Sequence, residues 1–454
     1  MPFIRYKVIG GKEYAYEITS YWDKEGKRPR QRSRYLGVVV DREKGIYVNP
    51  YKTSSEKLIL DFGDSYFLVR FMESNMKDLY SYLLANGLLP LVLFRLTNRS
   101  GMSHAQPWYE GNVARYLACG SLSSQKISEL LSKIGDEGNV RKFFQNYLKA
   151  SAEGVAIDTT ALPNQIDLDL TQWGYSSDKV DEELKLILVI DRSARAPLYF
   201  RYVPGGIVDV STLTTTVREL QEMRLRVGLT VLDAGFFSEE NISLLASEGI
   251  DFLIRVPANR SLYRELMESV EKIEEPENAV IYGERALFIS EREFSFAGRK
   301  VFLYLVLDPE RRGRELRRYI VNHRKEASKF AIRRKGYMVL MSSVQISREE
   351  LIPLYYTRQF AEKAFSYSKD DLAILPLRVH GEETLRGYLF LIFISLIVYM
   401  KLQNCMGSVS LSLDILRNLK CKVFEHSIVI QEPTRDQKEL FDKIKVIVPK
   451  VMGI

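Results

Sequence analysis

The chain has 454 residues, which is too long for one compact domain and predicts two to four of them. Hydrophobic residues make up 46% and charged residues 27%, and the net charge of +7 is small enough that its distribution matters more than its sum. The three cysteines are far apart and the sequence holds no GxxxxGK[ST], so a disulfide framework, a cysteine metal site and a P-loop ATPase are excluded.

A membrane location is not indicated. The first residues, MPFIRYKVIGGKEY, have no apolar signal core, and the most apolar run, YLFLIFISLIVYM at residues 388–400, has 13 residues. Crossing a bilayer takes about 20 residues, so this run predicts a buried core helix. We therefore expect no membrane partner and a reducing, cytoplasmic location.

The first 150 residues divide into a β-rich and a helical part. Residues 1–50 predict short strands (FIRYKVI, YAYEITSYW, RYLGVVV), and residues 24–34 (KEGKRPRQRSR) carry six basic residues and one acid. A solvated hairpin loop and a DNA-backbone contact explain this basic run equally well. Residues 51–150 have helical periodicity, with Ser123 or Ser124 as a cap and Gly135 as an end, and could form a DNA-binding module or a scaffold.

From residue 151 strands and helices alternate. GVAIDTT predicts a first strand that ends at Asp158, and residues 184–192 and 196–206 predict the second and third. A helix at residues 211–226 comes next, and LTVLDAGFF then predicts a fourth strand that ends at Asp233. A helix capped by Ser238 and a fifth strand, DFLIRVP, complete the pattern. Three consecutive strands imply an antiparallel meander, and the later strand–helix–strand units imply parallel pairing, so the fold class is α/β with a mixed sheet.

Residues 259–344 interrupt this alternation with a β-rich segment. Within it, residues 311–335 hold eleven Lys or Arg and two Glu, a local net charge of +9. An exposed charged helix is one interpretation. A phosphate-tracking surface is favoured because Tyr319, Phe330 and Tyr337 border the cations. The candidate DNA contacts in this basic segment are Arg317, Arg318, Arg333 and Arg334.

Four residues further on share one predicted helical face. Tyr355, Arg358, Glu362 and Lys369 have offsets of 0, 3, 7 and 14. At about 100° per residue they lie at roughly 0°, −60°, −20° and −40°. One carboxylate flanked by two cations and a phenol suits a helix that works on a phosphodiester backbone. Glu362 could instead form an ordinary surface pair with Arg358.

Three carboxylates are the candidate metal ligands. Asp158 and Asp233 follow apolar strands, and strands that are neighbours would bring both to one site, which a helix carrying Glu362 could complete. Hard oxygen donors without nearby His or Cys point to Mg²⁺ or Mn²⁺, and three carboxylates can hold two ions about 4 Å apart. Taken singly, an Asp after a strand is a common turn or capping residue.

The motifs resemble a known family. The string Tyr355-x2-Arg358-x3-Glu362-x6-Lys369 matches the Y-(2)-R-(3)-E-(6)-K signature of the insertion-sequence-four transposases, and AIDTT and VLDAGFFSEEN resemble its two aspartate motifs. The resemblance covers roughly residues 110–400 and implies an RNase H-like DDE core with a β-rich insertion between the second Asp and the Glu.

The resemblance also implies an activity. Asp158, Asp233 and Glu362 would be the catalytic metal ligands, and Tyr355, Arg358 and Lys369 would contact phosphates of double-stranded DNA. The chain would then cut terminal inverted repeats and join a 3′-hydroxyl to target DNA, as a homodimer in the synaptic complex. A silent DNA-binding descendant of a transposase and a nuclease that does not join are the alternatives.

The expected domain plan has six parts. It comprises a β-rich segment (1–50), a helical domain (51–150), the first part of the core (151–258), the basic β-rich insertion (259–344), the second part of the core with the Glu helix (345–420) and a C-terminal tail (421–454).

Overall fold

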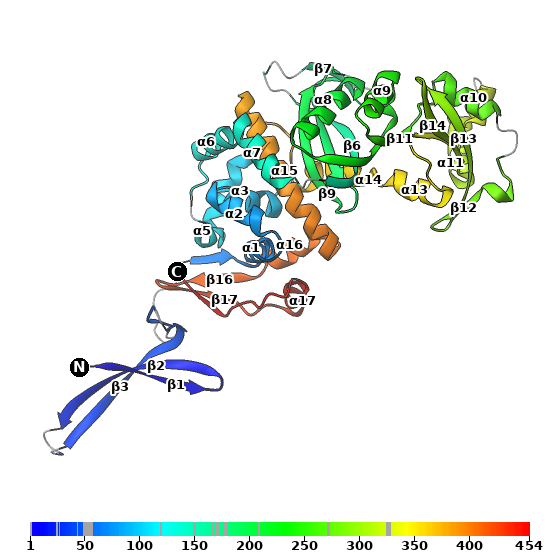
Figure 1. Ribbon diagram of the computed structural model, residues 1–454. Coiled ribbons are helices and arrows are strands. Elements are labelled where there is room, and N and C mark those ends of the chain that lie inside the picture. The colour runs from blue at the N-terminus through cyan, green and yellow to red at the C-terminus, as the bar shows by residue number, and fades with distance from the viewer. Residues whose placement is uncertain are drawn as a thin grey trace. The chain divides into compact units, whose positions relative to one another are not determined.

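A computed structural model of the chain describes residues 2–23, 26, 28–42, 44–48, 58–118, 120–148, 151–164, 168, 172–176, 179–207, 209–269, 273–323 and 328–454. Parts of the two basic runs, residues 24, 25, 27 and 324–327, and Cys119 lie outside the described residues. The chain forms two compact units. The terminal unit combines residues 1–130 with residues 402–454, and the central unit comprises residues 131–401 (Figure 1).

The terminal unit contains two small sheets and a group of helices. The strands of its N-terminal sheet are β1 (Phe3–Ile9), β2 (Lys12–Asp23), β3 (Arg28–Asp41) and β4 (Ile46–Val48). The second sheet has the order β18-β17-β16-β5, built from β5 (Leu58–Asp61), β16 (Lys420–Val423), β17 (Ser427–Ile430) and β18 (Val451–Gly453). Strands from both ends of the sequence are therefore hydrogen-bonded in one sheet.

The helices of this unit match the predicted helical segment and add two near the C-terminus. They are α1 (Gly63–Asn75), α2 (Lys77–Ala85), α3 (Leu89–Thr97), η1 (Met102–His104), α4 (Ala105–Glu110), α5 (Ala114–Leu117), α16 (Val409–Arg417) and α17 (Arg435–Lys443), with α6 (Ser124–Ile134) at the boundary. Ser123 accepts a hydrogen bond from the Lys126 amide at the start of α6, as its cap position predicted. Thr434 and Gln437 form a capping box at α17.

The central unit is built on one mixed sheet. The strands follow one another across the sheet in the order β12-β13-β14-β15-β11-β10-β6-β8-β7. β9, which is not in this series, also pairs with β8. The strands are β6 (Ser151–Pro163), β7 (Gln172–Ser176), β8 (Lys179–Asp191), β9 (Ala196–Pro204), β10 (Arg226–Leu232), β11 (Asp251–Arg255), β12 (Ala279–Tyr282), β13 (Arg285–Phe296), β14 (Arg299–Leu307) and β15 (Tyr337–Ser342).

The predicted order of the core is confirmed. β6, β8 and β9 form an antiparallel meander, while β10 pairs parallel with both β6 and β11. The resulting order β9-β8-β6-β10-β11 is that of an RNase H-like sheet. The predicted β-rich insertion is present, and its strands extend the core sheet because β15 pairs antiparallel with β11.

Helices cover both faces of this sheet. They are α7 (Glu137–Tyr147), α8 (Asp209–Glu222), η2 (Ala234–Phe236), α9 (Glu239–Ser247), α10 (Ser261–Ser269), η3 (Pro276–Asn278), α11 (Pro309–Asn322), α12 (Lys329–Arg333), α13 (Arg348–Tyr356), α14 (Gln359–Ser366), η4 (Tyr367–Asp371, a π-helical turn) and α15 (Glu382–Met406). Figure 1 shows α8 and α9 on one side of β6 and α14 on the other. Ser238 caps α9 as predicted, accepting a hydrogen bond from the Asn241 amide.

Strand alternation divides the core between the two faces. On β6, Val155 and Ile157 enter the cluster that packs against α8, α9 and α10. On β10, Val231 enters the opposite cluster, which includes Tyr355 of α13. Because successive side chains point to opposite faces, Asp158 and Asp233 belong to the face covered by α13 and α14.

The apolar run at residues 388–400 lies in α15. By length and composition α15 could cross a membrane, but 89% of its most apolar window is buried inside the protein. Phe390 and Phe393 pack against Phe144 of α7 and Phe200 of β9, with distances of 5.1–6.4 Å between the ring centroids. The prediction of a buried core helix is therefore confirmed.

Candidate functional site

The register of two parallel strands brings Asp158 and Asp233 together. Ile157 on β6 pairs with Leu232 on β10, and each aspartate is the next residue on its strand. Asp233 directly follows β10, as predicted. The prediction that the first strand ends at Asp158 is wrong, because β6 continues to Pro163 through pairing with β8. Asp158 thus lies within a strand that both neighbours hold in place.

The helical segment that faces these aspartates is broken. Tyr355 is in the last turn of α13, Arg358 directly precedes α14, Glu362 is in the first turn of α14, and Lys369 is in the π-helical turn η4. The assumption of one continuous helix is wrong, because α13 ends at Tyr356 and α14 begins at Gln359. Tyr355, Arg358 and Lys369 nevertheless contact the same region of the sheet, and Glu362 pairs with Arg358.

Arg358 is the centre of the cluster. Its Nη1 lies 3.2 Å from Asp158 Oδ2 and 3.5 Å from Asp233 Oδ2, and its Nη2 lies 2.7 Å from Glu362 Oε1. Since both aspartate oxygens approach one nitrogen this closely, they lie within about 7 Å of each other. The three predicted carboxylates thus surround one guanidinium.

Tyr355 and Lys369 flank this cluster. The Tyr355 hydroxyl donates a long hydrogen bond of 3.4 Å to Asp233 Oδ1, and Lys369 Nζ donates to Thr160 Oγ1 at 2.8 Å. Thr160 is two residues beyond Asp158 and therefore projects from the same face of β6. This hydrogen bond joins the π-helical turn to the strand that carries Asp158.

The cluster runs from the protein interior to solvent. The side chain of Asp158 is 12% exposed, that of Asp233 35% and that of Glu362 49%. Burial raises the pKa of Asp158 to about 6; Arg358 and the Thr159 amide oppose this shift, whereas the Asp233 and Glu362 carboxylates add to it. The open side at Glu362 would allow a polymer backbone to approach, while the deep side is shielded.

The two flanking residues also have shifted pKa values. Burial raises the pKa of Tyr355 to about 12, and the nearby Asp233 carboxylate adds to this shift, so the phenol stays protonated at neutral pH. Burial lowers the pKa of Lys369, and the carboxylates of Asp370 and Glu183 oppose that shift. Glu183 is completely buried on β8, and no sequence signal identified it as a neighbour of Lys369.

The donor set suits a hard divalent cation, but its present arrangement encloses an arginine. Within the described ranges, no group of three or more His, Cys, Asp or Glu side chains is arranged to hold a metal ion. The cluster nevertheless combines three carboxylates with one guanidinium, so with all three ionised it keeps an excess negative charge. Such a cluster binds a cation already and favours further positive charge.

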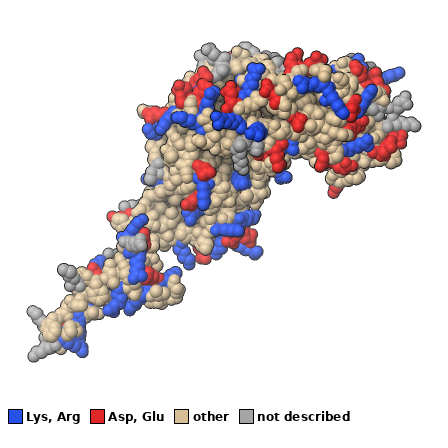
Figure 2. Space-filling view, in the orientation of Figure 1, with Lys and Arg blue, Asp and Glu red and all other residues tan. Residues whose placement is uncertain are grey.

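The other predicted residues lie elsewhere in the central unit. Arg317 and Arg318 are exposed on α11, whereas Arg333, at the end of α12, donates to the Met267 carbonyl at 3.1 Å, and Arg334 is half-buried. None of the contacts described for these four reaches the carboxylate cluster. Figure 2 shows Lys and Arg interspersed with Asp and Glu over this unit.

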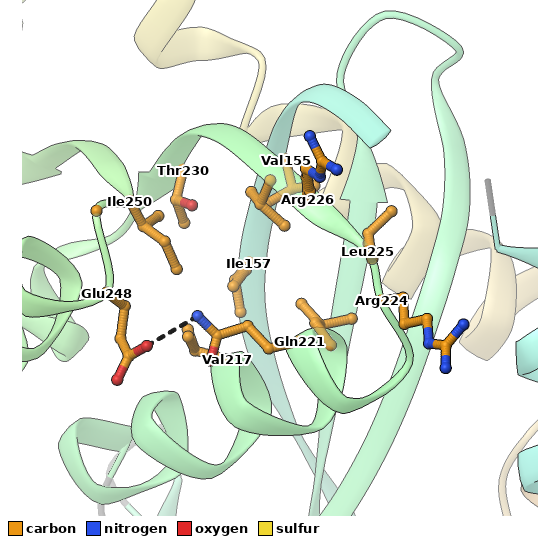
Figure 3. Close-up of a pocket in the computed structure, with 13 residues that line it drawn as sticks. Val155, Ile157, Val217, Gln221, Arg224, Leu225, Arg226, Thr230, Glu248 and Ile250 are labelled. Atoms are coloured by element: carbon orange, nitrogen blue, oxygen red, sulfur yellow. Dashed lines mark hydrogen bonds between the residues drawn. The ribbon is translucent and has the colours of Figure 1, made fainter. Parts of the chain in front are cut away.

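A cavity of about 690 Å³ lies on the other face of the sheet. Val155, Ile157, Val217 and Ile250 line it, and at its edge the Gln221 amide donates to Glu248 at 3.0 Å (Figure 3). Since Val155 and Ile157 project away from the Asp158 face, this cavity does not open onto the carboxylates.

Comparisons with known proteins place this arrangement in a family. Residues 149–398, more than half of the chain, match the family model described as the transposase DDE domain. A solved structure, the cryo-EM structure of the piggyBac transposase synaptic complex with hairpin DNA, is similar at 12% identity and a TM-score of 0.41, covering 84% of this chain and 70% of that one. No curated protein matches the chain. By the match to residues 149–398, which include Asp158, Asp233 and Glu362, this chain belongs to the transposase DDE domain family.

Proposed function

We propose that the chain is a DNA transposase of the insertion-sequence-four type, which cuts the ends of an insertion element and joins the 3′-hydroxyl to target DNA. The observation that carries the proposal is the convergence of Asp158, Asp233 and Glu362 around Arg358 within the family-matched residues. The intact Tyr-Arg-Glu-Lys spacing supports the assignment to this branch of the family.

In this proposal the three carboxylates are the ligands of Mg²⁺ or Mn²⁺, with two ions in the working site. Such ions would activate the attacking water or 3′-hydroxyl and stabilise the leaving oxygen of the phosphodiester. The hard oxygen donors and the excess negative charge of the cluster support this role. The exposure of Glu362 supports entry from the solvent side.

Arg358 has a second role in the proposal. Without bound cations, its guanidinium neutralises part of the carboxylate charge. When cations take over that task, the same guanidinium is available to a phosphate, which it can bind through two parallel hydrogen bonds. Tyr355 as a hydroxyl donor and Lys369 as an ammonium would contact further phosphate oxygens on the same side.

The partner in this proposal is double-stranded DNA, both as the terminal inverted repeats and as the target. The protein acts as a homodimer. It works in the cytoplasm, associated with the nucleoid. The exposed Arg317 and Arg318 would contact the DNA backbone. Arg334 would contribute from a half-buried position. Arg333 would contribute least, since its guanidinium is already hydrogen-bonded to a carbonyl.

Cleavage of duplexes that carry the element ends tests the proposal. With Mg²⁺, we expect Asp158→Asn, Asp233→Asn and Glu362→Gln each to reduce cleavage by about 10²–10³-fold while end binding persists, since loss of a key electrostatic group costs this much. Asp251→Asn is the matched control, because Asp251 lies at the start of β11 and bonds Ser343 at 3.0 Å. If one of the three site variants cut DNA at the wild-type rate, the substituted residue would not be a catalytic metal ligand.

The two alternatives give different results in the same assay. A silent DNA-binding descendant would bind the ends and cut nothing with any divalent cation. A nuclease would cut intact ends, yet would fail to join a pre-cut end with a free 3′-hydroxyl to target DNA.

A further inference from the structure

The N-terminal sheet includes a two-stranded ribbon. β1 pairs with β2 up to Ile18, and β4 pairs with β3 from Val38 onward. Between these limits, residues 19–23 of β2 and 28–32 of β3 are paired only with each other among the described strands. Figure 1 shows β2 and β3 continuing as a narrow ribbon beyond β1.

Four arginines share one face, which we call the arginine face: Arg28, Arg30 and Arg32 belong to the ribbon, and Arg34 lies just beyond it on β3. They occupy alternate positions of β3 without an irregularity in their register, so all four project to the same side. Neighbours in the row are about 7 Å apart, because a strand rises about 3.3 Å per residue. That interval is comparable with the distance between successive phosphates along a nucleic-acid strand.

Only weak ion pairs engage the arginine face. Arg30 lies 2.9 Å from Asp23 and Arg34 lies 3.8 Å from Glu17, and these two arginine side chains are 48% and 63% exposed. Arg28 and Arg32 are exposed and form no ion pair with another described residue. Exposed pairs contribute about 0–1 kcal/mol, so a phosphate can replace these carboxylates at little cost.

The ribbon also lacks a core of its own. Every described residue of its outer part is exposed apart from the half-buried Asp23, and two large aromatic side chains, Tyr21 and Trp22, are 48% and 62% exposed. An isolated two-stranded ribbon is marginally stable in water. A ribbon of this kind fits the major groove of duplex DNA, where backbone contacts on one face would fix its position.

We propose that the arginine face of the β2–β3 ribbon binds the phosphate backbone of duplex DNA. The inference rests on the proposed function, which supplies DNA as the partner. An arginine row can also protect an exposed strand edge from pairing with other chains. The regular spacing on a single face favours phosphate binding, since edge protection requires charge but no common face.

The test compares two variants that remove the same charge from opposite faces of one sheet. Arg28→Gln/Arg32→Gln removes two cations from the arginine face. Arg5→Gln/Lys7→Gln removes two from the other face, where both cations lie over aromatic rings of Phe3 and Tyr16. Anisotropy of a labelled random-sequence duplex is measured for the full chain between 50 and 200 mM salt, with circular dichroism as the check on folding.

We expect the first variant to bind about tenfold more weakly near 0.1 M salt, with a slope of log K against log salt smaller by about 2, because each lost phosphate contact releases one counterion fewer. The second variant should match the wild type. Equal losses in both variants, or a loss in neither, would overturn the proposal. Aggregation of the first variant with unchanged binding would assign the row to edge protection and would also overturn it.

The outcome is separable from that of the proposed function. If the wild-type protein cuts element ends while the first variant binds DNA like the wild type, the proposed DNA-binding role of the arginine face fails. The proposed transposase function is then retained. If the first variant loses DNA binding while the wild-type protein cuts nothing, the DNA-binding role of the arginine face is retained and the proposed transposase activity fails. The Asp158→Asn variant, whose change lies outside the terminal unit, should keep the wild-type salt slope.

Discussion

Asp158 and Asp233 both present an Oδ2 atom to the same nitrogen of Arg358, although 75 residues separate them in the sequence. The cause is the parallel pairing of β6 with β10, in which Ile157 lies opposite Leu232 and the next residue on each strand is an aspartate. A shift of one residue in this register would send one aspartate to the apolar face beneath α8. The site therefore depends on sheet register more than on any local motif.

Removing the Arg358 guanidinium should destabilise the protein, and divalent cations should restore part of the lost stability. In Arg358→Gln three carboxylates face one another without a positive partner, and we expect the free energy of unfolding at pH 7.5 to fall by about 2 kcal/mol. Millimolar Mg²⁺ or Ca²⁺ should recover more stability in this variant than in the wild type, as measured by urea unfolding. Arg386→Gln is the control, because Arg386 is similarly buried but bonds Tyr202 and one carboxylate, Glu382. An identical cation response in both variants would contradict a cation-binding cluster.

The raised pKa of Asp158 predicts how stability depends on pH. Its value of about 6 in the folded protein exceeds the ordinary 3.8, so the folded state binds the proton more tightly than the unfolded state. The stability from this group is complete below pH 3.8 and is lost as the pH rises through 6. Compared with Asp158→Asn, the wild type should lose up to about 3 kcal/mol between pH 4 and pH 7. Unfolding titrations across this range measure the difference, and parallel curves for the two proteins would refute it.

Two substitutions of Tyr355 should distinguish the contribution of its ring packing from that of its hydroxyl group. Its ring is buried in the cluster between α13 and the sheet, whereas its hydroxyl bond to Asp233 is long at 3.4 Å. Tyr355→Phe should therefore change stability by less than about 1 kcal/mol, while Tyr355→Ala should cost about 3–5 kcal/mol. If the hydroxyl contacts a DNA phosphate, the Phe variant should bind element ends several-fold more weakly. Wild-type end binding by a stable Phe variant would leave Tyr355 with a packing role only.

A glycine lets α15 approach the end of α6 in the central unit. A Cβ atom on Gly387 would overlap the backbone carbonyl of Leu131, which no rotamer change can relieve. We expect Gly387→Ala to destabilise the protein by about 3 kcal/mol. Gly381→Ala is the matched control, because the nearest atom, Thr384 Oγ1, lies 3.7 Å from the added Cβ. Thermal denaturation compares the two, and equal melting temperatures would show that the helices separate without cost.

Much of the central sheet could be predicted from local patterns. Short apolar runs bounded by turn residues identified β6, β8, β9, β10 and β11 in the correct order, because strand alternation and helix periodicity are local properties. The extra strand β7 was not predicted from the sequence, yet its residues pair with β8. Whether such a short segment forms a strand depends on its cross-strand partners, which sequence periodicity does not reveal.

The sequence by itself determined which side chains are the candidates for the chemistry: two aspartates after apolar segments and a Tyr-Arg-Glu-Lys series at fixed spacing. Only the tertiary structure decided how they meet. Parallel pairing placed Asp158 beside Asp233, and a break before Arg358 with a π-helical turn at Lys369 replaced the continuous helix that the spacing suggested. The physical reason is that residue types and spacing are local, whereas strand register and a broken helix are set by packing against the rest of the sheet.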